Sequence, residues 1–210
     1  MLKTESVPAT TPGSTRLMIV LHGLGDSMDG YRWLPRALGM PEMNYLLVDA
    51  PDSYGDGFSW YDIHGAQAPG IRRSRELLFA LLDHESTRGF PTEQTCLFGF
   101  SQGCLMTIEV GLRYPKVFTG LIGISGYVHE PETTICELSP VALRQRLLLT
   151  HGPQDPLIPI DAVREQIRTL QRAHVNIRWR ELDKAHTIAG PEETALIREF
   201  VINCYATPPN

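Results

Sequence analysis

The stretch Gly99-Phe100-Ser101-Gln102-Gly103 places a serine between two glycines, directly after the apolar run Thr95–Phe98. The run predicts a buried strand, and the residues that follow predict a helix over Cys104–Tyr114. A serine on such a strand-to-helix turn has a strained backbone and an exposed hydroxyl, and the glycines avoid collisions with the neighbouring strand and helix. Taken alone, the pattern also fits a plain glycine-rich turn. The rest of the chain decides between these interpretations.

Size and composition limit the class of protein. The chain has 210 residues, which suits one domain with a single large core, and it is 42% hydrophobic and 20% charged, as is usual for globular proteins. The net charge of −5 is spread over both signs, so a nucleic-acid partner is not expected. No apolar stretch approaches the ~20 residues that cross a bilayer, so stable membrane insertion is not expected either.

The ends of the chain and its cysteines lead to further expectations. The first 14 residues are rich in Thr, Pro and Ser and lack the apolar centre of a signal peptide. We expect residues 1–14 to be a flexible leader, residues 15–206 to form the folded domain and residues 207–210 to be a C-terminal tail. Cys96 and Cys104 fall on predicted core elements, which favours reduced thiols and a cytoplasmic location, although four cysteines leave disulfides open.

Strands and helices alternate along the chain. Apolar or alternating runs predict strands at Leu17–Leu21, Tyr45–Val48, Thr95–Phe98, Gly120–Ile124, Leu147–Thr150 and Val175–Leu182, and helical spacing marks Ile71–Ser86, Ala162–His174 and Glu192–Tyr205. This order predicts an α/β fold in one domain: a mostly parallel central sheet with helices on both faces. About twenty residues separate Ser125 from Leu147, too few for a large cap domain, so we expect an open site.

Four loops that follow predicted strands carry chemically useful residues. Ligands of such sheets bind at the carboxyl ends of the strands. The loops are His22–Asp26, the turn at Ser101, His151–Asp155 and Asp183–Thr187. Their shared position at one edge of one sheet favours a catalytic site over a chance motif.

Ser101 needs a base, because an unassisted hydroxyl is a poor nucleophile at neutral pH. In α/β-hydrolases, whose serine turn this one matches, the order along the chain is Ser, then Asp or Glu, then His. His186 follows the last predicted strand, where that fold has its base. The other downstream histidines have simpler explanations. His129 lies in a polar loop, His151 is expected to pack under the loop that carries Asp155, and His174 lies at a helix end.

Asp155 is the best candidate for the carboxylate that orients His186. It lies between nucleophile and base in the chain, although an ordinary Asp-Pro turn would look the same. Asp161 is the nearest competitor, but it is well placed to cap a helix that starts at Ala162. Asp183 is too close to His186 in sequence to be a good partner.

Two backbone amides are candidates for an oxyanion hole. One belongs to Gln102, after the serine and at a helix start, and the other to Leu24, in a glycine-containing loop whose His22 we expect to be structural. Each such donor is typically worth roughly 3–4 kcal/mol in the transition state. The loop lacks the Gly-Lys-Ser/Thr ending of a phosphate-binding turn. No metal-ligand spacing is present, so no metal and no cofactor are expected.

An apolar wall for the substrate is expected beside the serine. Besides Leu24, the candidates are Met28, Phe58, Trp60, Leu157 and Ile188. Each of these residues would equally fit the ordinary core of the domain.

Together these segments resemble the phospholipase/carboxylesterase family, an α/β-hydrolase group that includes bacterial carboxylesterases and acyl-protein thioesterases. The likeness covers about Leu17 to Tyr205 and rests on Leu21–Asp26, Ser59–Ile63, Gly99–Gly103, His151–Pro159 and Ala185-His186. It implies a triad of Ser101, Asp155 and His186 with an oxyanion hole from Leu24 and Gln102. Cys104 and Ala185 stand where family members commonly have glycine.

The resemblance implies a serine hydrolase that cleaves carboxylic esters with small to medium acyl chains through an acyl-enzyme. Alternatives are an acyl-protein thioesterase, a lysophospholipase, or a non-catalytic α/β-hydrolase binding protein, against which the intact Ser, Asp and His argue. The expected partner is a small-molecule ester or thioester, and the chain is expected to be a monomer or a homodimer.

Overall fold

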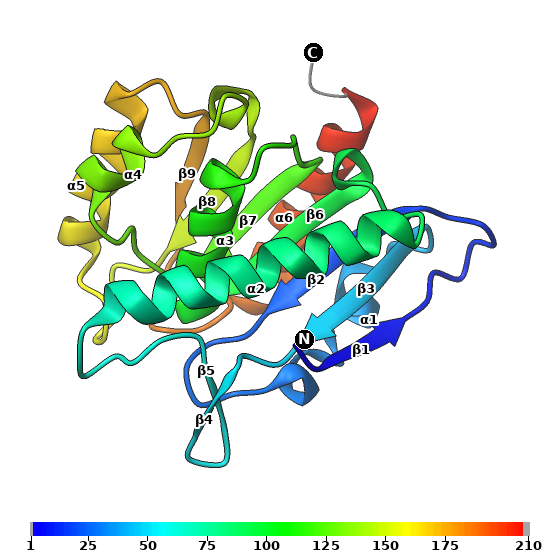
Figure 1. Cartoon of the computed structure of the whole chain (residues 1–210), viewed down its shortest axis with the longest axis horizontal. Coiled ribbons are helices and arrows are strands. Elements are labelled where there is room, and N and C mark those ends of the chain that lie inside the picture. The colour runs from blue at the N-terminus through cyan, green and yellow to red at the C-terminus, as the bar shows by residue number, and fades with distance from the viewer. Residues whose placement is uncertain (1, 208–210) are drawn as a thin grey trace.

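A seven-stranded sheet forms the centre of the computed structural model, which describes residues 2–207 (Figure 1). Its strands lie in the order β1-β3-β2-β6-β7-β8-β9. Their bounds are β1 Thr4–Val7, β2 Arg16–Leu21, β3 Met43–Val48, β6 Thr95–Phe100, β7 Gly120–Ile124, β8 Leu147–His151 and β9 Ile177–Glu181. All neighbouring strands are parallel except β1, which runs antiparallel to β3. The predicted, mostly parallel sheet is confirmed.

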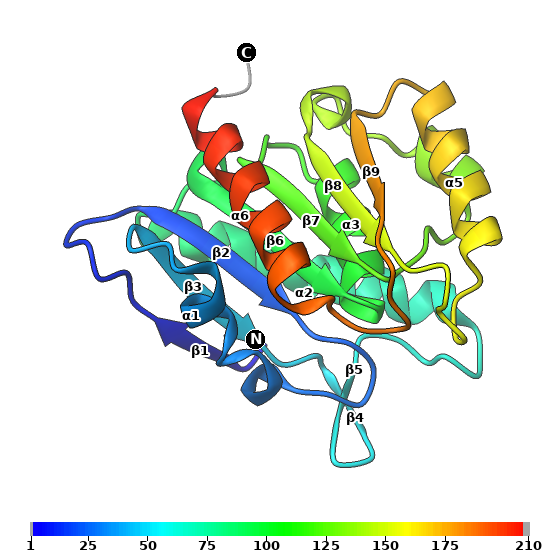
Figure 2. The same cartoon turned by 180° about the vertical axis from the view of Figure 1, so that it is seen from behind.

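Helices cover both faces of this sheet, as predicted. One face carries α2 Gln67–Thr87, α3 Gln102–Arg113, α4 Pro131–Cys136 and α5 Ile160–Arg172 (Figure 1). The opposite face carries α1 Leu34–Leu38 and α6 Gly190–Ala206 (Figure 2). Between Ser125 and Leu147 lie only the short α4 and a 3-10 turn, so this segment inserts no large cap domain.

Alternate residues of each strand supply two cores. In β2, Leu17 and Ile19 point to the side of α2, α3 and α5, whereas Met18 and Val20 point to the side of α1 and α6. Because both faces of the sheet are covered, the central strands β2, β6, β7 and β8 are buried at nearly every position, which is why their apolar runs were continuous in the sequence.

The expected flexible leader is the main correction to the predicted order. Residues Thr4–Val7 form β1 and pair with Tyr45–Val48 of β3. A strand edge is satisfied by main-chain hydrogen bonds, which need no apolar side chains, so this polar segment gave no recognisable signal. An ion pair between Lys3 and the buried Asp49, 3.3 Å, also holds the segment. Residue 1 and residues 208–210, most of the predicted tail, lie outside the described residues.

A two-stranded hairpin beside the carboxyl edge of the main sheet was also not predicted. It consists of β4 Asp52–Tyr54 and β5 Gly57–Ser59, and its register pairs Tyr54 with Gly57. Strands of three residues are too short to show a reliable period. The hairpin matters because the chain that leaves it runs directly to the site.

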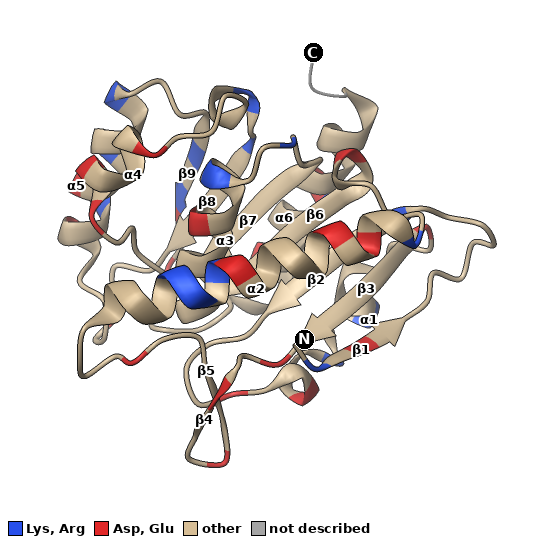
Figure 3. Cartoon of the chain, in the orientation of Figure 1, with Lys and Arg blue, Asp and Glu red and all other residues tan. Residues whose placement is uncertain are grey.

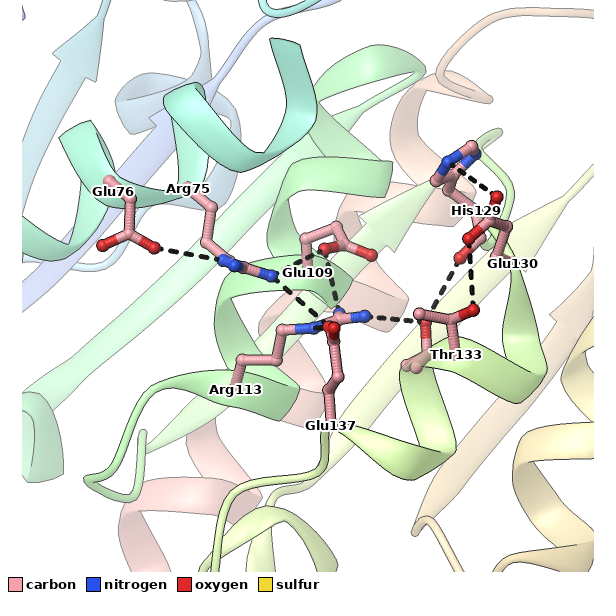
Figure 4. A network of polar contacts seen from close by, with 9 residues as sticks. Arg75, Glu76, Glu109, Arg113, His129, Glu130, Thr133 and Glu137 are labelled. Carbon is pink, nitrogen blue, oxygen red and sulfur yellow. Dashed lines mark hydrogen bonds and ion pairs between the residues drawn. The ribbon is translucent and has the colours of Figure 1, made fainter. Parts of the chain in front are cut away.

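Acidic and basic residues are interspersed over α2 and the rest of the face that Figure 3 displays. Part of this charge is buried between α2, α3 and α4 (Figure 4). Glu109 of α3, 4% exposed in its side chain, pairs with Arg113 at 2.9 Å and with Arg75 of α2 at 3.6 Å, and Arg113 bonds to Glu137 at 2.7 Å. Burial raises the pKa of the Glu109 carboxyl, and the arginines oppose that shift. The network fixes the far part of α3, the helix that begins directly after Ser101.

Two further observations concern the chain as a whole. Within residues 2–207, no helix combines the length and the apolar character needed to span a membrane. All four cysteines are free thiols, and Cys96 and Cys104 are buried, as predicted.

Candidate active site

Ser101 occupies the sharp turn between β6 and α3. Its φ is 55°, in the left-handed region that is unusual for a residue other than glycine. A Cβ at Gly99 would collide with the carbonyl of Gly103, and a Cβ at Gly103 with the carbonyl of Leu21 in β2. The two glycines therefore let the turn lie against its own helix and the next strand, as the sequence suggested.

His186 lies within hydrogen-bond distance of Ser101. The distance from His186 Nε2 to Ser101 Oγ is 2.9 Å, and the distance from His186 Nδ1 to Asp155 Oδ2 is 2.7 Å. An ionised carboxylate only accepts, so Nδ1 carries the proton and Nε2 is free to accept from the serine. The structure thus brings together the three residues that were chosen from separate loops.

Asp155 is held as a charged acceptor in the loop that follows β8. Its Oδ1 accepts the N–H groups of Leu157 and Ile158, each at 2.9 Å. Burial opposes ionisation, but the hydrogen bond from His186 and the two backbone bonds outweigh it and lower the pKa of Asp155. The carboxylate therefore stays negative beside the histidine at neutral pH.

A second histidine, His151, lies beneath this carboxylate. It is fully buried, its Nε2–H donates to the carbonyl of Ile158 at 2.9 Å, and the same nitrogen is 3.3 Å from Asp155 Oδ2. Burial lowers its pKa, so the ring is neutral. Its position under the acid loop agrees with the packing role expected from the sequence.

The loop that carries His186 is tied to α6 by a buried ion pair. Lys184 Nζ lies 2.6 Å from Glu193 Oε1, and the N–H of Ala189 donates to Glu193 Oε2 at 2.6 Å. Burial lowers the pKa of Lys184, and Glu193 offsets part of the shift. Sequence reasoning missed this pair, because lysine and glutamate in a loop and a first helical turn are typical of solvated surface.

Leu24 and Gln102, the two residues expected to supply oxyanion donors, lie near Ser101 on different elements. Gln102 is the first residue of α3, where a helix leaves its N–H groups without intrahelical acceptors. Leu24 follows β2 in the loop beside the serine turn, and Gly23 packs against Phe100 and Ser101. Among the residues that the structure describes, the N–H groups of Leu24 and Gln102 have no hydrogen-bond acceptor.

A cavity of about 680 Å³ opens onto Ser101 and His186. Most of its wall is apolar or aromatic, and members from several elements line it: Leu24, Tyr61, Ile63, Tyr127, Leu157, Ile158 and Val163. The hydroxyls of Tyr61 and Tyr127 lie 2.9 Å apart and add a polar patch. Such a wall suits an apolar group of a substrate. Of these lining residues, only Leu24 and Leu157 were expected in the substrate wall, although Tyr61, Ile63 and Ile158 lie in segments that carry the family resemblance.

Four residues that we expected in the substrate wall lie outside the lining of this cavity. Met28 and Trp60 are buried, at 8% and 0% exposure, and Met28 belongs to the core on the α1 and α6 side. Phe58 and Ile188 pack at the borders of the two cores. An apolar residue near a catalytic loop points either to a cavity or to a core, and its local sequence does not fix which.

Both departures from the family pattern fit the structure. Cys104 lies in the first turn of α3 and contacts Gly123 and Gly126, where any side chain on those glycines would collide with it. Burial raises the pKa of the Cys104 thiol to about 12. The thiol is therefore a neutral packing group beneath Ser101, and Ala185 leaves the adjacent His186 in contact with Ser101.

Within residues 2–207, no three or more His, Cys, Asp or Glu side chains gather as they would around a metal ion.

A serine turn in a parallel sheet covered on both faces, with Asp and His after later strands, defines an α/β-hydrolase. The family model described as Phospholipase/Carboxylesterase matches residues 3–204. The chain therefore belongs to the phospholipase/carboxylesterase family and is a hydrolase of the carboxylesterase and acyl-protein thioesterase type.

Two relatives agree with this assignment, and one solved structure shares the fold. The chain is 33% identical over 158 residues to acyl-protein thioesterase 1 of Schizosaccharomyces pombe, covering 69% of this chain and 70% of that protein. It is 30% identical over 200 residues to a probable carboxylesterase of Oryza sativa subsp. japonica, covering 87% and 75%. The crystal structure of esterase PE8 superposes with a TM-score of 0.87 at 24% identity, covering 97% and 99%, which shows a shared fold.

Proposed function

We propose that the protein hydrolyses carboxylic esters with small to medium acyl chains, with Ser101 as the nucleophile. The observation that carries the proposal is the continuous line of contacts from Ser101 Oγ through His186 to Asp155, at 2.9 and 2.7 Å. These are the distances that a base and its orienting carboxylate need.

The reaction proceeds in two steps of acyl transfer. His186 Nε2 takes the proton of Ser101, whose oxygen attacks the substrate carbonyl, and the amides of Leu24 and Gln102 hold the negative oxygen that forms. The imidazolium then gives its proton to the departing alcohol. A water molecule, deprotonated by the same histidine, attacks the acyl-enzyme, and the released Ser101 oxygen regains the proton. Asp155 keeps the histidine tautomer and stabilises its charged form.

A thioesterase activity is the second candidate, because the relative named above as acyl-protein thioesterase 1 is 33% identical to this chain. The same steps apply to a thioester, with a thiol as the leaving group. The lysophospholipase alternative has no specific observation in its favour. That the chain works as a monomer or a homodimer in the cytoplasm stays a prediction.

A series of substrates tests the proposal. Initial rates are measured on p-nitrophenyl esters and on acyl thioesters from two to sixteen carbons, with Ser101→Ala as the blank. We expect the highest kcat/KM on short and medium esters and no turnover by the blank. A preference for long acyl thioesters would replace the ester assignment by the thioesterase one. The absence of turnover on every substrate would instead favour a binding protein.

A further inference from the structure

The two proposed oxyanion donors are joined by a buried chain of hydrogen bonds. Gln102 belongs to α3, and Leu24 belongs to the loop after β2, so no covalent neighbour sets the distance between their amides. The segment Phe58–Tyr61, which begins in β5 and continues past the hairpin, lies between these two elements and bonds to both.

On the α3 side, the carboxamide of Gln102 is fully engaged by this segment. Its Oε1 accepts the backbone N–H of Trp60 at 2.9 Å and the hydroxyl of Ser59 at 3.3 Å. Its Nε2 donates to the carbonyl of Tyr61 at 3.0 Å. The side chain of Gln102 therefore fixes the first turn of α3, which carries the Gln102 amide.

On the β2 side, the indole of Trp60 reaches the loop of Leu24. Its Nε1–H donates to the carbonyl of His22 at 2.9 Å. The His22 ring in turn donates from Nδ1 to the carbonyl of Gly23 at 2.6 Å and accepts the N–H of Ala50 at Nε2, 3.0 Å. The His22 ring thus ties the chain immediately before Leu24 to Ala50, which lies beyond the end of β3.

The same segment holds the loop immediately after Leu24. The N–H of Gly25 donates to the carbonyl of Phe58 at 2.9 Å, and the N–H of Phe58 donates to the carbonyl of Asp26 at 2.9 Å. Gly57 allows this approach, since a Cβ there would collide with the carbonyl of Gly25.

Burial makes each of these hydrogen bonds costly to break. Trp60 is 0% exposed, His22 1% and Gln102 3%, so a lost bond leaves a polar group without water to replace the partner. Trp60 is also absent from the lining of the cavity at Ser101. Its effect on a substrate therefore passes through the residues that it holds.

We propose that Trp60 is a positioning residue that sets the distance between the amides of Leu24 and Gln102 through its two N–H groups. The inference rests on the proposed function, because that distance matters for the rate only if acyl transfer takes place at Ser101. An oxyanion donor acts on the transition state, and a displacement of about 1 Å can lower a rate about 100-fold.

Two variants break the chain at different bonds. Trp60→Phe keeps an aromatic ring and the bond to Gln102 but loses the indole N–H. Gln102→Met keeps the backbone amide of residue 102 but loses the bonds to Ser59, Trp60 and Tyr61. Tyr205→Phe is the matched control, because it removes a ring donor to a backbone carbonyl, that of Gln94 at 2.8 Å, at the opposite edge of the sheet.

For wild type and each variant, we would measure kcat and KM on p-nitrophenyl butyrate, the inhibition constant of a trifluoromethyl ketone and the melting temperature. The ketone forms a hemiketal oxyanion with the serine, so its inhibition constant reports on how well the oxyanion hole binds a negative oxygen. We expect each variant to lower kcat about 10- to 100-fold with little change in KM. The inhibition constant of the ketone should rise by a similar factor. The double variant should resemble the worse single one, because both break one chain. Tyr205→Phe should lower the melting temperature without changing kcat.

A kcat of Trp60→Phe within about twofold of wild type would refute the inference, and so would a loss confined to KM. If Trp60→Phe does not fold, the same criteria apply to Gln102→Met. A wild-type protein that cleaves no ester and takes no fluorophosphonate on Ser101 would refute the proposed function itself, so the two failures are distinct.

Discussion

Asp155 uses both carboxylate oxygens, one for backbone amides and one for His186, and this division of partners defines its expected contribution. Asp155→Asn keeps the shape of the side chain but removes the charge and the acceptor that select the Nδ1–H tautomer of His186. We expect kcat to fall about 10⁴-fold with little change in KM. Steady-state kinetics on a p-nitrophenyl ester measure this, with Asp161→Asn as a matched control. A loss of less than about tenfold would contradict the assignment.

The buried neutral histidines make stability depend on pH. Burial lowers the pKa of His22 and His151 below the ordinary value of 6.5, so below that pH the unfolded chain binds protons that the folded chain does not. Stability is therefore lost as pH falls below about 6.5, by up to about 1.4 kcal/mol per pH unit for each histidine. The pKa of Asp155 is lowered from 3.8, so its contribution is lost only in more acidic solution.

Urea unfolding between pH 5 and pH 8 checks this expectation. The free energy of unfolding should decline from pH 7 to pH 5. His151→Gln should reduce the slope of that free energy against pH by up to about 1.4 kcal/mol per pH unit, the contribution of one titrating proton. A free energy that does not change over this range would contradict the buried neutral state of both rings.

The residues brought together at the site were predictable to different extents. Ser101, Asp155 and His186 follow recognisable strands, and parallel strands end at one edge, so topology alone predicts that they meet. Their catalytic roles stay predictions. Trp60 could not be placed in the same way, because its contacts with His22 and Gln102 join positions about forty residues apart.

Close packing between β2, β6 and α3 explains the glycines around the serine. A methyl group at residue 103 would meet the backbone carbonyls of Leu21 and His22, which belong to β2 and its loop. We expect Gly103→Ala to lower the free energy of unfolding by about 3 kcal/mol and to displace the serine turn, so that activity is lost. The measurement is urea unfolding together with ester turnover.

Gly13→Ala is the control for that substitution. Residue 13 has a φ of 73° but nothing within 4 Å of the added Cβ. Its cost should stay near or below about 1 kcal/mol, because only backbone strain is involved. Equal costs at the two positions would contradict the packing explanation.

Elements differ in how much their sequence reveals. β2, β6, β7 and β8 are central strands with apolar runs, and the predictions for them fall within two residues of the structure. β1 and the β4–β5 hairpin are short or polar, and main-chain pairing and loop contacts hold them instead. Missing the hairpin matters more for the site than missing β1, because the segment that follows the hairpin joins the two proposed oxyanion donors.

Across the whole chain, the site is assembled from residues between 22 and 186, all at the carboxyl edge of one sheet (Figures 1 and 2). The family and the order of elements could therefore be inferred from the sequence. The shape of the cavity could not, because it depends on side chains such as Tyr61 and Tyr127 that meet only in the folded chain.

Covalent labelling tests the central claim, that Ser101 is the nucleophile of a serine hydrolase, most directly. The protein is incubated with a fluorophosphonate, weighed intact by mass spectrometry and mapped by peptide digestion. We predict the mass of one adduct, on the peptide that contains Ser101, and none on Ser101→Ala. Labelling that persists in Ser101→Ala, or an adduct on another residue, would contradict the account.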